Sequence, residues 1–173
     1  MNKITHDFVW SGDVMSINTE LDLDRPMRDV RHEAVLNIVR TASVLGQRGA
    51  DLFRRFGLTE AQFNVLFSLK YKERNWSQSD LGRRLVVTRA SVTSVLDKLE
   101  EKGLVERLQV PGNRRIYHVD LTAEGQKLLD KVEPLYRNDI HEVLSGFDEE
   151  TCRNLIQQME VIRTRVQALG ESK

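Results

Sequence analysis

The sequence predicts a mainly α-helical protein with one small β-hairpin. Over most of the chain, apolar residues recur at steps of three and four, the spacing of helices with one buried face. One short stretch instead alternates, with Tyr117, Val119 and Leu121 at every second position, which is the period of a strand. Capping residues and glycines separate these runs and set the expected ends of the helices.

Length and composition limit the number of domains and the cell compartment that can be expected. A chain of 173 residues with 40% hydrophobic residues can form one domain, or one domain with an oligomerisation extension. No run of about eighteen apolar residues is present, so no membrane span is predicted. The N-terminus lacks a basic head followed by an apolar stretch, so no secretion signal is expected. The single Cys152 excludes an intramolecular disulfide and fits a reducing compartment, so we expect a cytoplasmic protein.

The charge is balanced overall but not along the chain. Residues 1–33 carry four Lys/Arg against seven Asp/Glu, whereas residues 76–115 carry eight against five, a local excess of three positive charges. A basic segment of this kind favours nucleic-acid binding, although a solvated surface gives the same composition.

The N-terminal third is expected to be an arm followed by one long helix. Residues 1–25 show no sustained period. Asp24-Arg25-Pro26 resembles a helix start, because proline is tolerated in the first turn. Helical spacing then continues until Gly57. Residues 26–57 are therefore predicted to form a helix.

Three shorter helices follow. Thr59-x-x-Gln62 is a capping box, and so is Ser77-x-x-Asp80, where an acid stands three residues after a hydroxyl. Thr88 is expected to cap the third helix, whose apolar residues would face inward, and Gly103 to end it. The inward-facing residues are Val92, Val95, Leu96 and Leu99. Two short helices joined by about three residues predict a helix-turn-helix.

A hairpin with arginines at its tip is expected next. Residues 104–110 and 116–121 have strand character, and Pro111-Gly112-Asn113-Arg114-Arg115 joins them. A helix-turn-helix followed by such a hairpin is a winged helix, so residues 58–121 are predicted to form a winged helix-turn-helix DNA-binding domain.

Two further helices should close the chain, one capped by Thr122 and one by Asp148. We expect residues 26–57 and 122–170 to pack together, and against a second copy, as a helical dimerisation region. The alternative is a monomer whose end helices complete one core.

The polar face of the expected recognition helix supplies the first DNA-binding candidates: Thr88, Arg89, Ser91, Thr93, Ser94 and Lys98. Arg89 is the strongest candidate for base reading, because a guanidinium can make a forked pair of bonds to guanine. Arg114 and Arg115 are expected to reach the minor groove or the phosphates, and Ser77 and Ser79 a phosphate. The alternatives are a solvated helix face, a solvated hairpin and a simple helix cap.

Three strings of residues resemble the MarR family of bacterial transcription regulators, over residues 28–169. They are Leu96-Asp-Lys-Leu-Glu-Glu-Lys-Gly-Leu-Val-Glu-Arg107, Asn113-Arg114-Arg115 and Leu121-Thr-Ala-Glu-Gly125. The resemblance implies a homodimer that places two recognition helices about 34 Å apart in a pseudo-palindromic operator on double-stranded DNA. It also implies release of DNA by a small aromatic or phenolic effector, or by an oxidant.

Two residues depart from the family's pattern. Asn113 stands where an aspartate usually supports the wing arginine, and Ser94 stands where an arginine is frequent. The resemblance therefore does not transfer the base preferences of relatives to this chain.

An effector pocket is expected where the winged helix meets the dimerisation helices, with Arg40, Phe63 and Phe67 as candidates. The alternative is plain core for the phenylalanines and a surface charge for Arg40. Cys152, near a helix start, is either a redox switch or an incidental thiol.

No metal, cofactor or catalytic motif is recognisable, so an enzyme is not expected. The sequence predicts a homodimeric, sequence-specific DNA-binding transcriptional regulator, a repressor released by a small-molecule effector. The alternative function is a winged-helix protein-interaction module without specific DNA binding.

Overall fold

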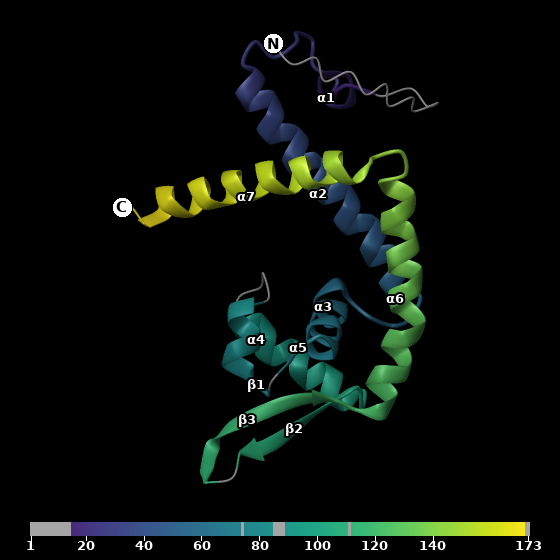
Figure 1. The fold of residues 1–173 in the computed structure, drawn as a ribbon, viewed down its shortest axis with the longest axis vertical. Coiled ribbons are helices and arrows are strands. Elements are labelled where there is room, and N and C mark those ends of the chain that lie inside the picture. The colour runs from purple at the N-terminus through teal and green to yellow at the C-terminus, as the bar shows by residue number, and fades with distance from the viewer. Residues whose placement is uncertain (1–14, 74, 85–88, 111, 172–173) are drawn as a thin grey trace. The chain divides into compact units, whose positions relative to one another are not determined.

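The structure is a computed structural model that describes residues 15–73, 75–84, 89–110 and 112–171, with backbone only for residues 89–91 and 113–116. It confirms a mostly helical fold with one small antiparallel sheet (Figure 1). The elements are α1 (Ile17–Glu20), α2 (Val30–Arg54), α3 (Glu60–Lys70), β1 (Trp76–Ser77), α4 (Gln78–Arg84), α5 (Arg89–Glu101), β2 (Val105–Val110), β3 (Asn113–Leu121), α6 (Ala123–Val143) and α7 (Glu149–Glu171). Within the described ranges, no helix is long and apolar enough to cross a membrane.

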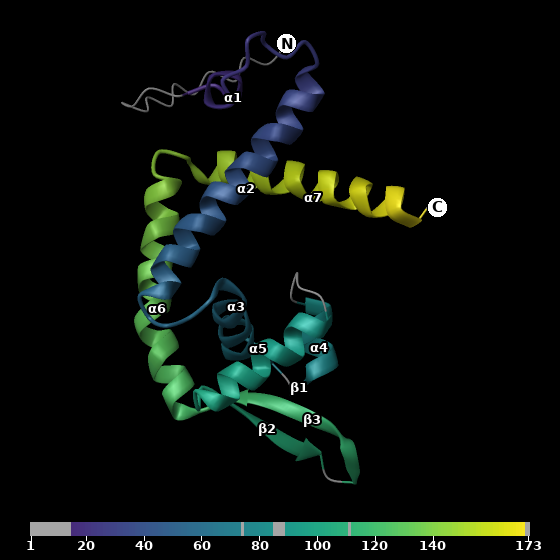
Figure 2. The same cartoon turned by 180° about the vertical axis from the view of Figure 1, so that it is seen from behind.

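The chain divides into two compact units. One holds residues 24–139, from the approach to α2 through most of α6, and contains the winged helix. The other holds the chain ends, with α1 and α7 among its described parts. The view from behind shows the same path through α2 to α6 (Figure 2).

The long N-terminal helix begins later than the sequence predicted. Its N-cap is Asp29, whose carboxylate accepts a hydrogen bond from the Arg31 backbone N–H at 2.9 Å. The expected start at Asp24-Arg25-Pro26 is therefore wrong, because the first helical residue is Val30. The expected arm also contains a four-residue helix, α1, capped by Ser16.

The predicted capping box at the start of α3 and the predicted glycine after α5 are confirmed. Thr59 and Gln62 form a reciprocal capping box, with backbone-to-side-chain distances of 3.0 and 3.2 Å. Gly103 has a φ of +67°, its N–H donates to the Glu100 carbonyl, and the next N–H donates to the Leu99 carbonyl. This pattern closes a helix when a residue can adopt the left-handed region, which glycine does without a steric penalty.

The sheet has one strand more than the sequence predicted. Its order is β1-β3-β2, and Trp76 and Ser77 of β1 pair with Val119 and His118 of β3. A two-residue strand has no detectable period, so sequence alone gave no signal for it. The pairing places the start of α4 against the middle of the wing.

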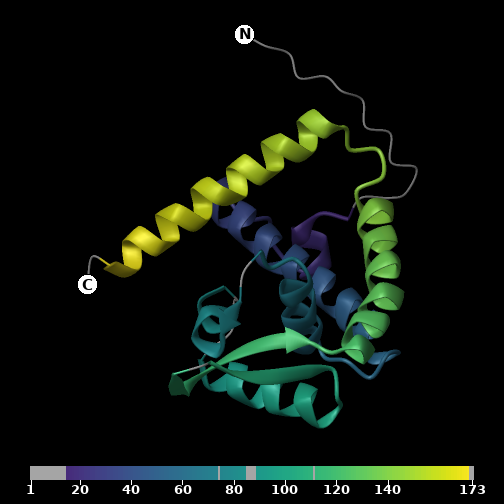
Figure 3. The ribbon, with the colours of Figure 1, turned by 60° about the horizontal axis from the view of Figure 1, so that its bottom comes forward.

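The hairpin turn is shorter than predicted. β3 begins at Asn113, which pairs with Val110, so only Pro111 and Gly112 separate the strands. Gly112 has a φ of +80°, a conformation that suits a tight turn. The backbone of Arg114 and Arg115 therefore belongs to β3, beside the turn, where the register between β2 and β3 shifts. The two long strands of the wing are drawn in Figure 3.

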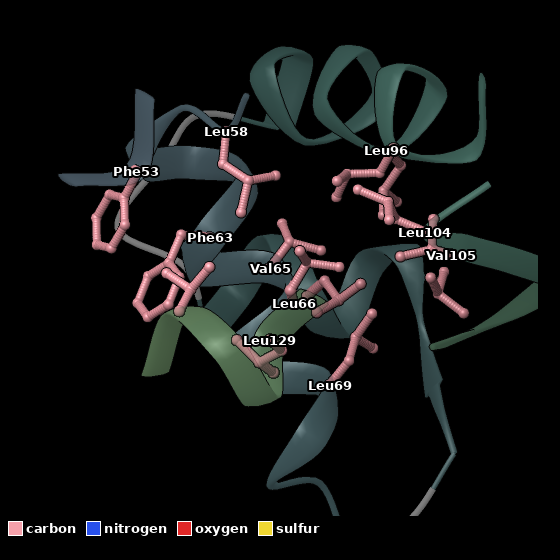
Figure 4. Close-up of a cluster of buried hydrophobic side chains, with 14 of the residues drawn as sticks. Phe53, Leu58, Phe63, Val65, Leu66, Leu69, Leu96, Leu104, Val105 and Leu129 are labelled. Carbon is pink, nitrogen blue, oxygen red and sulfur yellow. The ribbon is translucent and has the colours of Figure 1, made fainter. Parts of the chain in front are cut away.

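The hydrophobic core lies in the unit of residues 24–139. Side chains from the end of α2, from α3, α5, β2 and α6 point toward one another there (Figure 4). Phe53 and Phe63 stack with ring centroids 4.1 Å apart, and Leu66, Leu96 and Leu129 are fully buried. The core therefore joins the winged helix to the adjoining ends of α2 and α6.

One buried carboxylate also ties α3 to α6. Glu133 is 4% exposed and accepts hydrogen bonds from the Lys70 ammonium at 2.7 Å, from the Tyr71 hydroxyl, and from the Arg137 guanidinium at 2.6 Å. Lys70 also reaches Asp130 at 2.8 Å. Donation by Lys70, then by Tyr71, lowers the pKa of Glu133 to about 2 despite its burial. The carboxylate is therefore held in its charged form between the two helices.

Candidate nucleic-acid interface

The helix-turn-helix starts with the predicted capping box. The Ser77 backbone N–H and hydroxyl both donate to the Asp80 carboxylate, at 3.0 and 2.7 Å, and the Asp80 N–H donates back to the hydroxyl at 3.2 Å. These bonds, the hydroxyl's first, lower the pKa of Asp80. The Ser77 hydroxyl thus serves the cap, whereas Ser79 is exposed on the first turn of α4.

The recognition helix α5 is divided into two faces. Val92, Leu96 and Leu99 are at most 1% exposed, and Val95 is half-buried against the same core. On the other face Thr93, Ser94 and Lys98 are exposed. Burial of one side of α5 against the core therefore leaves the other side for a ligand.

Several DNA-binding candidates fall outside the described residues. Thr88 precedes the described start of α5. The backbone of Arg89 and Ser91 belongs to α5 and that of Arg114 and Arg115 to β3, but their side chains lie outside the described part of the structure. Their roles stay predictions.

Gln78 is a residue that the sequence analysis missed. It is the first residue of α4, and its amide nitrogen donates to the Thr93 hydroxyl on α5 at 2.5 Å. In the sequence, only its position directly after the capping Ser77 could have indicated that Gln78 lies near the recognition helix. The bond links the supporting helix to the polar face of the recognition helix.

Two of the positively charged residues in the segment 76–115, Arg107 and Lys102, make contacts within the protein. Arg107 of β2 donates to Asp97 of α5 at 2.5 Å and also to Glu100, and its side chain is only 19% exposed. The Lys102 ammonium donates to the Gly57 carbonyl at 2.6 Å. Arg107 therefore fastens the wing to the recognition helix and is not placed to neutralise a phosphate.

We expect Arg107→Ala to weaken DNA binding about five- to tenfold while the protein still folds. The change frees β2 from α5 and leaves two acids on α5 unpaired, which repel phosphates. Fluorescence anisotropy with an operator duplex, beside thermal melting, measures both effects. Arg54→Ala is the control, because Arg54 makes an exposed pair with Asp51 and should change neither. Unchanged affinity for Arg107→Ala would show that the wing needs no such tether.

The three predicted effector residues differ in burial, and their role in binding an effector stays a prediction. Phe63 is 2% exposed and belongs to the core, Phe67 is 37% exposed and its ring lies 5.7 Å from that of Phe63, and Arg40 is exposed on α2. A cavity of about 600 Å³ lies elsewhere, between α2 and α6. Its lining is Val44, Gln47, Arg48, Asp51, Leu52, Arg55, Leu135, Asn138 and Asp139.

This cavity combines apolar walls with paired charges. Arg48 of α2 donates to Asp139 of α6 at 3.0 Å across it, and both side chains remain partly exposed. Arg55 and Asp51 add a second cation and a second acid. The sequence analysis missed the site because its residues come from helices that are about ninety positions apart.

Comparison with known proteins agrees with this geometry. Residues 58–117 match the model of the MarR family. The chain is 30% identical over 135 residues to the HTH-type transcriptional regulator PecS of Dickeya dadantii (strain 3937), which covers 76% of this chain and 81% of PecS.

Two solved structures show the same fold. The regulator MosR of M. tuberculosis, solved in complex with DNA, superposes with a TM-score of 0.61 at 29% identity, covering 77% of this chain and 97% of MosR. CouR of Rhodococcus jostii RHA1, solved bound to p-coumaroyl-CoA, gives a TM-score of 0.69 at 18% identity, covering 79% of this chain and 95% of CouR. With this winged helix and these relatives, the chain belongs to the MarR family of DNA-binding transcriptional regulators.

Proposed function

We propose that the protein is a homodimeric repressor that binds a pseudo-palindromic operator in the cytoplasm and leaves it when a small molecule binds. The observation that carries the proposal is the division of α5, whose apolar side is sealed in the core while Thr93, Ser94 and Lys98 face outward. Short hydroxyls and a cation suit close contact with bases and phosphates. A dimer seated on a promoter would block access of RNA polymerase.

Exposed apolar side chains support the dimer. On α2, Val30, Val35 and Val39 are 53–74% exposed, and on α7 Val166 and Leu169 are 63% and 73% exposed. Such residues on long helices favour burial against another subunit, because a large exposed apolar surface is rare in a monomer. We therefore assign α2 and α7, with α6, to the dimerisation region.

The proposal predicts salt-dependent, sequence-specific DNA binding through arginines of α5 and the wing. We expect Arg89→Ala and Arg115→Ala each to weaken binding to DNA from upstream of the protein's own gene by about 10- to 100-fold. A lost bidentate base contact, expected for Arg89, is worth about 1–3 kcal/mol, and Arg115→Ala removes a cation from the minor groove or the phosphates. Fluorescence anisotropy across a salt series measures this, because affinity falls with salt as counterions are released.

The same experiment includes a control variant and tests the alternative function. Arg153→Ala, which removes an exposed pair with Glu149 on α7, should leave affinity unchanged. Equal, weak binding of wild type and both variants to operator and scrambled duplexes would favour the protein-interaction module instead.

We propose further that the cavity between α2 and α6 holds the effector. Arg48 and Arg55 suit a carboxylate or phenolate, and Val44, Leu52 and Leu135 suit an apolar or aromatic body. An anion that takes Arg48 from Asp139 would replace the bridge between the helices. Since a ligand shifts only the equilibrium that it distinguishes, it must bind better to the geometry that does not fit DNA.

We expect aromatic carboxylates and phenols to release the labelled operator from wild type, and Arg48→Gln to raise the required concentration about tenfold or more. The reason is that a charge-assisted hydrogen bond from a half-exposed guanidinium to the anion is lost. Arg40→Gln on the same helix, outside the cavity lining, is the matched control and should respond as wild type does. An effector response abolished by Arg40→Gln but retained by Arg48→Gln would place the site at the residues that the sequence first indicated.

A further inference from the structure

A hydrogen bond between Gln78 and Thr93 connects the supporting helix α4 to the recognition helix α5. Gln78 opens α4 and is half-buried, whereas Thr93 lies one turn into α5 on its exposed face. The Gln78 Nε2–Thr93 Oγ1 distance is 2.5 Å. A side chain from the supporting helix therefore engages a hydroxyl on the exposed face of the recognition helix.

The direction of this bond restricts the threonine. A hydroxyl offers one proton and two lone pairs. The Gln78 amide nitrogen donates, so it occupies a lone pair of Thr93 and leaves the hydroxyl proton to donate elsewhere.

The backbone next to Gln78 is held in place. The flanking residue Ser77 is fixed both by the capping box with Asp80 and by pairing of β1 with β3. On the other side of the bond, Val92 and Leu96 anchor α5 in the core. The backbones that carry the two side chains are therefore both held in place.

We propose that Thr93 is a base-reading residue that acts as a hydrogen-bond donor, and that Gln78 is the positioning residue that makes it one. This inference rests on the proposed function, since it needs α5 in the major groove. A donor selects base edges that present an acceptor there, namely guanine O6 and N7, adenine N7 or thymine O4, and rejects cytosine, which presents only an amino group. Gln78 would thus contribute to sequence specificity through Thr93.

Selection of bound duplexes from a randomised operator library tests this. Thr93→Val keeps the shape of the side chain, removes the hydroxyl, and identifies the base pair whose preference depends on it. At that position we expect wild type to favour guanine or thymine over cytosine by about fivefold, the usual size of one hydrogen bond. Gln78→Met should lose this preference while other positions keep theirs.

Gln78→Glu gives the sharpest outcome. A carboxylate only accepts, so it would take the Thr93 proton and turn the hydroxyl's lone pairs toward the base. We expect the preference to shift about fivefold toward cytosine or adenine, which present amino groups. The added charge should weaken binding to every duplex, and Ser79→Glu, on the adjacent residue, controls for it by weakening binding without the shift.

The possible outcomes test the proposed function separately from the roles of Thr93 and Gln78. If wild type selects no sequence at all, the proposed function fails. If wild type selects a sequence but Thr93→Val leaves every position unchanged, Thr93 does not read bases. If Thr93→Val removes a preference that Gln78→Met and Gln78→Glu both keep, then Gln78 does not set the direction of the bond. Circular dichroism melting of each variant confirms that it folds.

Discussion

Gly125→Ala is expected to destabilise the protein by about 3 kcal/mol or more, enough to unfold much of it near physiological temperature. An added Cβ would lie 2.0 Å from the Leu104 carbonyl oxygen and 3.0 Å from its carbon. The oxygen also accepts from the Thr122 N–H at 3.2 Å, and the Thr122 hydroxyl donates to the Gly103 carbonyl at 2.6 Å. Both backbones are fixed, so neither can move away without the loss of these bonds.

Chemical denaturation followed by circular dichroism measures the effect. Gly170→Ala on α7 is the matched control, because a Cβ there would meet nothing within 4 Å. It should be neutral or raise the free energy of unfolding by up to about 1 kcal/mol, since alanine suits a helix better than glycine. A Gly125→Ala variant within about 1 kcal/mol of wild type would contradict the close approach of α6 to the end of α5.

Glu133→Gln is expected to lower the free energy of unfolding at pH 7 by about 2–3 kcal/mol. The substitution keeps the size of the side chain but removes the charge that Lys70, Tyr71 and Arg137 solvate. Breaking a buried ion pair leaves the partners uncompensated, and here Arg137 recovers water because it is 61% exposed. Urea unfolding of both proteins measures the difference.

The pH dependence of this difference has a definite sign. The pKa of Glu133 is lowered from an ordinary 4.5 to about 2 in the folded protein. A carboxylate with a lowered folded pKa stabilises the protein above its unfolded pKa, and that stability is lost as the pH falls. We therefore expect the gap between wild type and Glu133→Gln to be full at pH 6–7 and to close progressively below about pH 4.5.

The control for this experiment is Glu149→Gln, which breaks an exposed pair with Arg153 on α7. It should change stability by less than about 0.5 kcal/mol at any pH. A gap for Glu133→Gln that persists undiminished at pH 3 would mean that the carboxylate's charge is not what stabilises the junction.

The sequence by itself determined the features that depend on near neighbours in the chain. Capping boxes at Thr59 and Ser77 and the left-handed Gly103 involve partners within five residues, so a local pattern predicts them. Helical spacing likewise identified the buried face of α5. Local signals were weaker where several starting residues are possible, and the first residues of α2 and of β3 were predicted wrongly.

Only the tertiary structure decided the features whose partners are far apart in sequence. The pairing of Trp76 with Val119, the bond from Gln78 to Thr93, the role of Arg107 and the charged Glu133 beside Lys70 have no local pattern. Gly125 combines a feature visible in the sequence with a reason visible only in the structure. The sequence marked it as part of a family string, but the reason for a glycine there is the Leu104 backbone, which packing of the core brings to within 2.0 Å of a Cβ.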